Sequence, residues 1–106
     1  MCGHFRHMTK QERTARAETV VNVVARNAGT PALQLVRTYK TADTRHRDRM
    51  VYLLDEVGLS RTEIAGIFRW ANPTNTLHAI KRVVKRMHTT DEEAGIITQL
   101  RREINV

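Results

Sequence analysis

The chain of 106 residues carries 18 Lys and Arg against 11 Asp and Glu, a formal net charge of +7. This length supports one domain with a modest core and excludes a second catalytic domain. The single cysteine, Cys2, excludes a disulfide framework, and no apolar run approaches the roughly 18–20 residues of a membrane span. We therefore expect a cytoplasmic protein whose excess positive charge attracts polyanions.

Helical signals begin after residues 1–8, which we expect to be disordered. Thr9 and Glu12 can form a capping box, in which the hydroxyl and the carboxylate satisfy each other's backbone amides, and Gly29 supplies a helix stop. The apolar residues between these signals recur at helical spacing: Ala17, Val20, Val21, Val24 and Ala28. The pattern predicts one domain over residues 9–106 that opens with a helix.

Two further helices are expected before residue 60. Thr30 is a cap, and Pro31 occupies the first helical position, where its missing N–H costs nothing. The buried side of this short helix is expected to be Leu33, Leu35 and Val36. A third helix starts near Asp43 or Thr44 and ends at Gly58, and its apolar stripe is Met50, Leu53, Leu54 and Val57.

The remaining chain predicts three more helices. Ser60 and Glu63 form a second capping box, before the apolar residues Ile64, Ala65, Ile67 and Phe68. Asn72-Pro73 caps a helix that runs to about His88, with an expected inner face of Leu77, Ile80, Val84 and Met87. Thr90 and Glu93 form a third capping box for a last helix, whose inward residues are Ile97, Leu100 and Ile104. With no alternating strand pattern, the fold class is all-α with six helices.

Residues 60–88 match a helix-turn-helix, because two helices are joined by a very short turn and the second is basic. The second helix, residues 73–88, carries four Lys and Arg and no acid. On a helical wheel, the sector opposite the apolar face holds Asn75, His78, Arg82, Lys85 and Arg86, with Thr74 and Lys81 at its edge. This distribution predicts a DNA-recognition helix.

The two ends of this helix predict different contacts. Thr74, Asn75 and His78 lie in the leading turns, where such helices bond base edges in the major groove. The expected phosphate partners are the basic residues Arg61, Lys81, Arg82, Lys85 and Arg86. The alternative is a solvated face whose cations complement the helix dipole, but that alternative leaves the small polar residues of the leading turns unexplained.

The stretch from Arg45 to Ile104 resembles the C-terminal DNA-binding domain (domain IV) of the bacterial replication initiator DnaA, and Val20 to Val36 resembles that domain's leading segment. The resemblance rests on TNTLHAIKRV at 74–83 and TEIAGIF at 62–68. The family signature is Asp-His-Thr-Thr-Val-Leu-His-Ala after a helix that ends in phenylalanine. The matching residues are Phe68, Thr74, Leu77, His78 and Ala79. The signature positions that differ are Asn72, Pro73, Asn75 and Thr76, and Arg69-Trp70 replaces the turn glycines.

The resemblance implies DNA contacts from Thr74 and His78, with Arg45 and Arg47 near the phosphate backbone. The family also sends an arginine from a basic loop into the minor groove, and the corresponding residues here are Arg37, Tyr39 and Lys40. Because Asn72-Pro73 replaces a pair that helps read the family's box, the resemblance implies a retained fold and an altered target.

The initiators carry an ATPase module, whereas this chain has no G-x-x-x-x-G-K-[ST] loop. A stand-alone reader suits transcriptional control, and the chain is similar to small activators of gene transfer agent and prophage-like clusters. We therefore expect a nucleoid-associated transcription regulator, with activation favoured, that binds promoter DNA. The alternatives are a phage-type replication factor or competitor of the initiator at origin boxes, and a module that recruits RNA polymerase or a co-activator.

An enzyme is the least expected class, because no carboxylate pair and no nucleophile–base arrangement appears. Cys2, His4 and His7 fit no standard zinc-binding spacing, so we expect no metal and no cofactor. Trp70 is expected to cover the turn as a hydrophobic plug, and the alternative is stacking on DNA or a partner.

Overall fold

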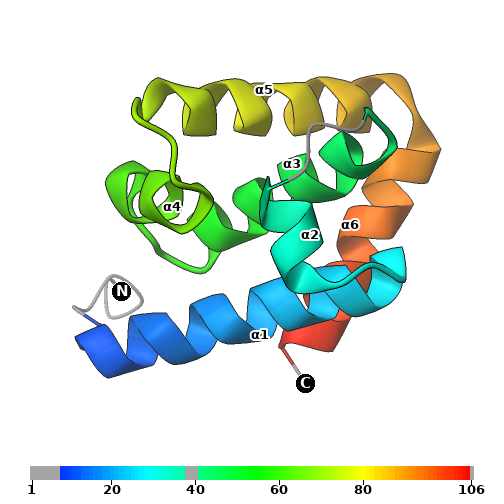
Figure 1. Ribbon diagram of the computed structural model, residues 1–106. Coiled ribbons are helices and arrows are strands. Elements are labelled where there is room, and N and C mark those ends of the chain that lie inside the picture. The colour runs from blue at the N-terminus through cyan, green and yellow to red at the C-terminus, as the bar shows by residue number, and fades with distance from the viewer. Residues whose placement is uncertain (1–7, 38–40, 106) are drawn as a thin grey trace, which may run out of the picture.

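The described part of the chain, residues 8–37 and 41–105 of the computed structural model, folds into six α-helices with no β-strand (Figure 1). In chain order they are α1 (Lys10–Ala28), α2 (Ala32–Arg37), α3 (Thr41–Glu56), α4 (Arg61–Phe68), α5 (Thr74–Thr89) and α6 (Asp91–Ile104). The predicted all-α, six-helix domain is confirmed. The third helix starts at Thr41, slightly earlier than the expected start near Asp43 or Thr44.

Two of the three expected capping boxes are present. The Thr9 hydroxyl accepts a hydrogen bond from the Glu12 amide at 3.0 Å, and the Glu12 carboxylate accepts one from the Thr9 amide at 3.0 Å. Ser60 and Glu63 exchange the equivalent pair at 3.1 and 2.9 Å. Each box satisfies amides that a helix start leaves without partners, which explains why α1 and α4 begin at these residues.

The third box is only half formed. The Thr90 hydroxyl accepts from the Glu93 amide at 3.3 Å, but the Glu93 carboxylate turns inward to Arg49 instead of back to the Thr90 amide. The expectation of a reciprocal box at α6 was therefore wrong. A charge-assisted pair with a buried arginine outcompetes an exposed hydrogen bond at the helix terminus.

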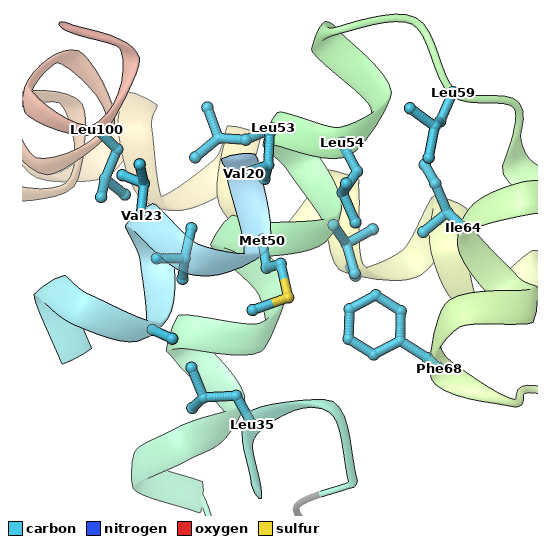
Figure 2. Packing of buried hydrophobic residues seen from close by; sticks show 14 residues of the cluster. Val20, Val23, Leu35, Met50, Leu53, Leu54, Leu59, Ile64, Phe68 and Leu100 are labelled. Atoms are coloured by element: carbon cyan, nitrogen blue, oxygen red, sulfur yellow. The ribbon is translucent and has the colours of Figure 1, made fainter. Parts of the chain in front are cut away.

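α3 lies at the centre of the molecule, with α5 along one side and α1 along the other (Figure 1). Its Met50, Leu53 and Leu54 are fully buried and meet side chains from α1, α2, α4 and α6 (Figure 2). The contributions of those helices include Val20, Val23, Leu35, Ile64, Phe68 and Leu100. Burying each large apolar side chain contributes about 1.5–3 kcal/mol, so this cluster holds α3 in place as the platform for α5.

Two expected inner faces differ in the structure. Leu33, expected on the buried side of α2, has 62% of its surface exposed. In α5 the fully buried residues are Thr76, Ala79 and Val83, while Val84 is 37% exposed. The helix is therefore rotated from the expected orientation, and in this orientation Arg82 and Arg86 contact carboxylates of α3 and α6. Within the described residues, no helix is long and apolar enough to cross a membrane.

Candidate nucleic-acid interface

The connection between α4 and α5 begins with an unusual arginine. Arg69 has φ +56°, the left-handed conformation that favours glycine, and its amide donates to the Gly66 carbonyl. The next residue, Trp70, donates its amide to the Ala65 carbonyl at 2.9 Å. Its ring stacks on Phe68 with centroids 4.8 Å apart. Trp70 is thus a hydrophobic plug over the turn, as expected.

Two hydrogen bonds fix the start of α5. The Asn72 side-chain oxygen accepts from the Thr74 amide at 2.9 Å, which confirms the expected cap. The buried Thr76 hydroxyl donates to the Arg61 carbonyl at 3.4 Å, and this bond joins α5 to the first turn of α4. The leading turn of α5 is therefore held by its neighbours while its outer side stays open.

An outer stripe runs along the solvent side of α5. We define it as Thr74, His78, Lys81 and Lys85, all of which are exposed. Their spacing of four, three and four residues places them on one face of the helix. Neither lysine forms an ion pair with another described residue. Asn75 is exposed beside the stripe at the leading end. The stripe therefore offers polar groups at one end and uncompensated positive charge further along.

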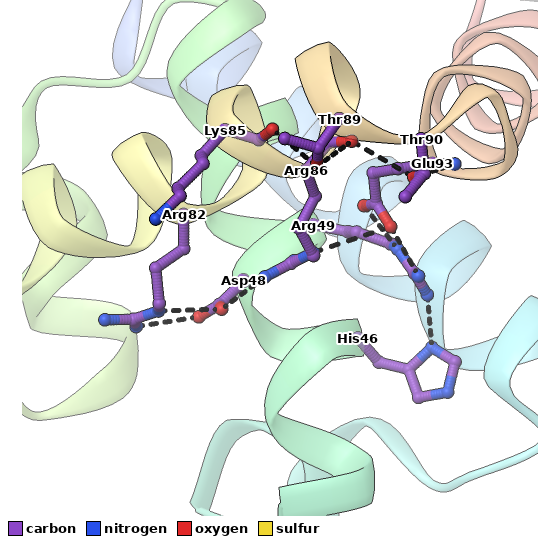
Figure 3. Close-up of polar contacts among 9 residues, drawn as sticks. All are labelled: His46, Asp48, Arg49, Arg82, Lys85, Arg86, Thr89, Thr90 and Glu93. Carbon is purple, nitrogen blue, oxygen red and sulfur yellow. Dashed lines mark hydrogen bonds and ion pairs between the residues drawn. The ribbon is translucent and has the colours of Figure 1, made fainter.

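The inner flank of α5 carries an arginine–carboxylate network, which we define as Arg82, Asp48, Arg86, Glu93 and Arg49 (Figure 3). The Nε and Nη2 groups of Arg82 donate to the two oxygens of Asp48, each at 2.9 Å. The Nε and Nη2 groups of Arg49 likewise donate to the two oxygens of Glu93, each at 2.8 Å. The two carboxylates are almost fully buried, with relative exposures of 1% for Asp48 and 4% for Glu93.

Arg86 lies between the two carboxylates and binds each less closely. Its Nη1 is 3.5 Å from Asp48, its Nε is 3.5 Å from Glu93, and its side chain is 22% exposed. Arg86 does not face fully outward as expected, because the buried acids hold it against the protein. Its contact with a phosphate stays a prediction. Arg82 is also engaged by Asp48, but its side chain remains 49% exposed.

The network changes the pKa of Arg82 and of Glu93, and Arg49 also affects the neighbouring His46. Hydrogen bonding to Asp48 raises the pKa of Arg82 above its ordinary value, despite partial burial. Burial alone would raise the pKa of Glu93, but the hydrogen bonds and charges of Arg49 and Arg86 outweigh it and lower that pKa. Burial and the nearby charge of Arg49 lower the pKa of His46, whose Nδ1 lies 3.3 Å from Arg49. Glu93 is therefore ionised near neutral pH.

The other predicted phosphate partners lie on three different elements. Arg61 is exposed at the first position of α4, and Arg45 is exposed near the start of α3. Arg47 is half-buried, with its guanidinium 5.6 Å from the Trp70 ring centroid, so part of its role is to cover the turn. Arg37 is exposed at the end of α2, whereas Tyr39 and Lys40 lie outside the described residues.

Sequence reasoning missed the importance of Asp48 and Glu93. Asp48 precedes the buried Val51 by three positions and so shares its helix face. That spacing, together with Arg82 and Arg86 four residues apart on α5, was the available signal.

Comparisons with protein-family profiles, with curated proteins and with solved structures find no match to this chain. Within residues 8–37 and 41–105, no group of three or more His, Cys, Asp or Glu residues could hold a metal ion. Cys2, His4 and His7 lie outside the described residues.

Proposed function

We propose that this protein is a sequence-specific double-stranded-DNA-binding regulator of transcription, in which α4 and α5 act as a helix-turn-helix and α5 enters the major groove. The observation that carries the proposal is the exposed side of α5. Thr74, Asn75 and His78 stand open at its leading end, while Lys81 and Lys85 follow without acidic partners among the described residues. This order matches a helix that reads bases first and meets phosphates further along.

The distribution of charge supports the same surface. α5 holds four Lys and Arg and no acid, whereas α6 opens with Asp91, Glu92 and Glu93. Arg61 and Arg45 add exposed cations from α4 and α3. The ion pairs Arg13–Glu63, Arg26–Glu103 and Arg101–Glu56 neutralise cations on other helices. The basic residues that form no ion pair within the described helices therefore include those expected to contact the phosphates of a bound duplex.

The resemblance to domain IV of DnaA supports a DNA-binding fold and points to a changed target. Asn72 fixes the start of α5 and Pro73 offers no amide, so neither reproduces the Asp-His pair of the family's box reader. We therefore propose promoter DNA as the target and activation, by contact with RNA polymerase or a co-activator, as the outcome. Binding at replication-origin boxes is the competing role, and mapping bound sites across the host genome separates the two.

The direct test is selection of binding sites from a pool of randomised duplexes, followed by affinity measurements across a salt series. With about two to four phosphates neutralised, the slope of log K against log salt is expected between about −2 and −4. Asn75→Ala and His78→Ala should each weaken binding to the selected site by about 5- to 150-fold and leave binding to scrambled DNA almost unchanged.

Each variant must keep the melting curve of the wild-type protein for the comparison to count. A salt slope near zero contradicts the electrostatic basis of the proposal. If both variants keep full preference for the selected site, the base-reading surface lies elsewhere.

A further inference from the structure

Arg82 differs from the exposed lysines of α5 in how its guanidinium is held. Asp48 accepts two parallel hydrogen bonds from its Nε and Nη2 groups, each 2.9 Å long (Figure 3). The side chain of Asp48 is 2% exposed and lies in the central helix α3, so it is a fixed anchor. Arg82 itself is 49% exposed. One edge of its guanidinium is therefore held by Asp48, while half of the side chain's surface stays open to solvent.

The hydrogen-bonding groups left over on Arg82 match those that read a base. A guanidinium has five N–H donors in a rigid fork. The bonds to Asp48 use two of them, which leaves both donors of Nη1 and one of Nη2. One of these donors on Nη1 and the one on Nη2 point the same way at the end of the guanidinium, and this pair suits two acceptors that lie side by side. Guanine presents such a pair in the major groove as its O6 and N7 atoms.

Arg82 is also poorly suited to act as a simple phosphate contact. The negative charge of Asp48 partly compensates the guanidinium, so Arg82 attracts a phosphate less strongly than Lys85 does. On the helix, Asn75, His78 and Arg82 follow one another at spacings of three and four residues, so they form one ridge. Lys81 and Lys85 lie on the outer stripe, which shares His78 with this ridge. The ridge of Asn75, His78 and Arg82 thus combines side chains that can bond base edges.

We propose that Arg82 is a specificity-determining residue that reads a guanine, with Asp48 as the positioning residue that presents it. The inference rests on the proposed DNA binding and deepens it. It divides α5 into a reading ridge, Asn75, His78 and Arg82, and a phosphate ridge, Lys81 and Lys85. Because Asp48 already orders the arginine, little rotamer entropy is lost when the base is bound.

The test uses duplexes selected from a randomised pool by the wild-type protein, and compares Arg82→Ala, Arg82→Lys and Lys85→Ala. Both Arg82 variants should lose preference for one G·C pair of the selected site and bind that site about 5- to 150-fold more weakly. Their affinity for scrambled duplex and their salt slope should stay close to wild type. Arg82→Lys is decisive because lysine keeps the charge and loses the fork.

Lys85→Ala is the matched control from the phosphate ridge. It should weaken binding to the selected and the scrambled duplex by the same factor, and make the salt slope shallower by about 0.9. The inference is overturned if Arg82→Ala behaves like Lys85→Ala, or if Arg82→Lys keeps the wild-type preference for the G·C pair. It is also overturned if neither Arg82 variant changes the preference for any base pair of the selected site. A wild-type protein that binds no duplex contradicts the proposed function itself, and this result is distinct from all three.

Discussion

Both sides of α5 carry positive charge, but only the residues of the inner flank are paired with acids of the described chain. On the outer stripe, Lys81 and Lys85 are exposed and form no ion pair within the described chain. On the inner flank, Arg82 and Arg86 face Asp48, and Arg86 also faces Glu93. A count of basic residues gives both sides the same weight. The structure separates cations that are available to a ligand from cations that also hold the helix.

This difference shows that residue type matters at each position. Arginine can donate to a carboxylate on one edge and keep donors for another partner, whereas lysine acts as a single charge on a flexible stem. On α5, the two basic positions that contact buried acids hold arginine, and the two basic positions of the outer stripe hold lysine. Variants on either side of α5 should therefore have very different consequences for stability.

The largest effect is expected from Asp48→Ala. Removing this buried carboxylate leaves Arg86 poorly compensated and takes away the anchor of Arg82. Breaking a buried pair by deleting one partner costs about 3–5 kcal/mol. We expect about 3 kcal/mol, the lower end of that range, because Arg86 still faces Glu93 at 3.5 Å. Urea denaturation measures the loss as a lower midpoint at an unchanged slope.

Asp55→Ala is the control for Asp48→Ala, since Asp55 lies on the same helix but is exposed. Its effect should stay within about 0.5 kcal/mol. Equal losses for the two variants would show that the buried network adds no stability of its own.

A smaller effect is expected from the pH dependence of Glu93→Gln. The folded state lowers the pKa of Glu93, so its ionised form stabilises the fold at pH values above the unfolded pKa of about 4.3. This contribution is lost as the pH falls through the folded pKa. Glu93→Gln should therefore be less stable than the wild type at pH 7, and the gap should narrow below about pH 4.3.

Glu92→Gln provides the comparison for this pH series, because Glu92 is the exposed neighbour. Its stability should run parallel to that of the wild type throughout acid titration. If the difference in stability between the wild type and Glu93→Gln stays constant down to pH 2, the ionisation of Glu93 does not contribute to stability.

Local signals in the sequence predicted most of the fold. Capping residues such as Thr9 and Ser60 specify where α1 and α4 begin, and Gly29 closes α1 at φ +66°. The apolar stripe at Met50, Leu53 and Leu54 identified the central helix. These signals succeed because each depends on residues within a few positions of one another, where helix geometry is fixed.

The rotation of α5 and the roles of its arginines could not be obtained in this way. A helical wheel ranks side chains by polarity, and it therefore placed Arg86 outside and Val84 inside. In the structure Arg86 is 22% exposed and contacts Asp48, 38 positions earlier, whereas Val84 is 37% exposed. The leading end of the candidate site was predictable from Thr74, Asn75 and His78. The pairing on its inner flank depends on tertiary contacts between distant acids and bases.

The smallest effect on stability is expected from the double variant Lys81→Gln/Lys85→Gln on the outer stripe. Glutamine and lysine have similar helix propensities, and neither position lies in the last turn of α5, so the dipole term is small. The two lysines are four residues apart, and like charges at this spacing destabilise a helix by about 0.2–0.5 kcal/mol. The double variant should therefore be slightly more stable than the wild type at low salt.

This gain should vanish in 1 M salt, where the screening length falls to about 3 Å. Denaturation at both salt concentrations measures it, and circular dichroism confirms that the helix content is retained. A loss above about 1 kcal/mol would show that the stripe supports the fold, and the comparison between the two sides of α5 would then fail. A gain means that Lys81 and Lys85 work against stability in the free protein. Such a cost is expected of residues whose partner is a polyanion that the free protein lacks.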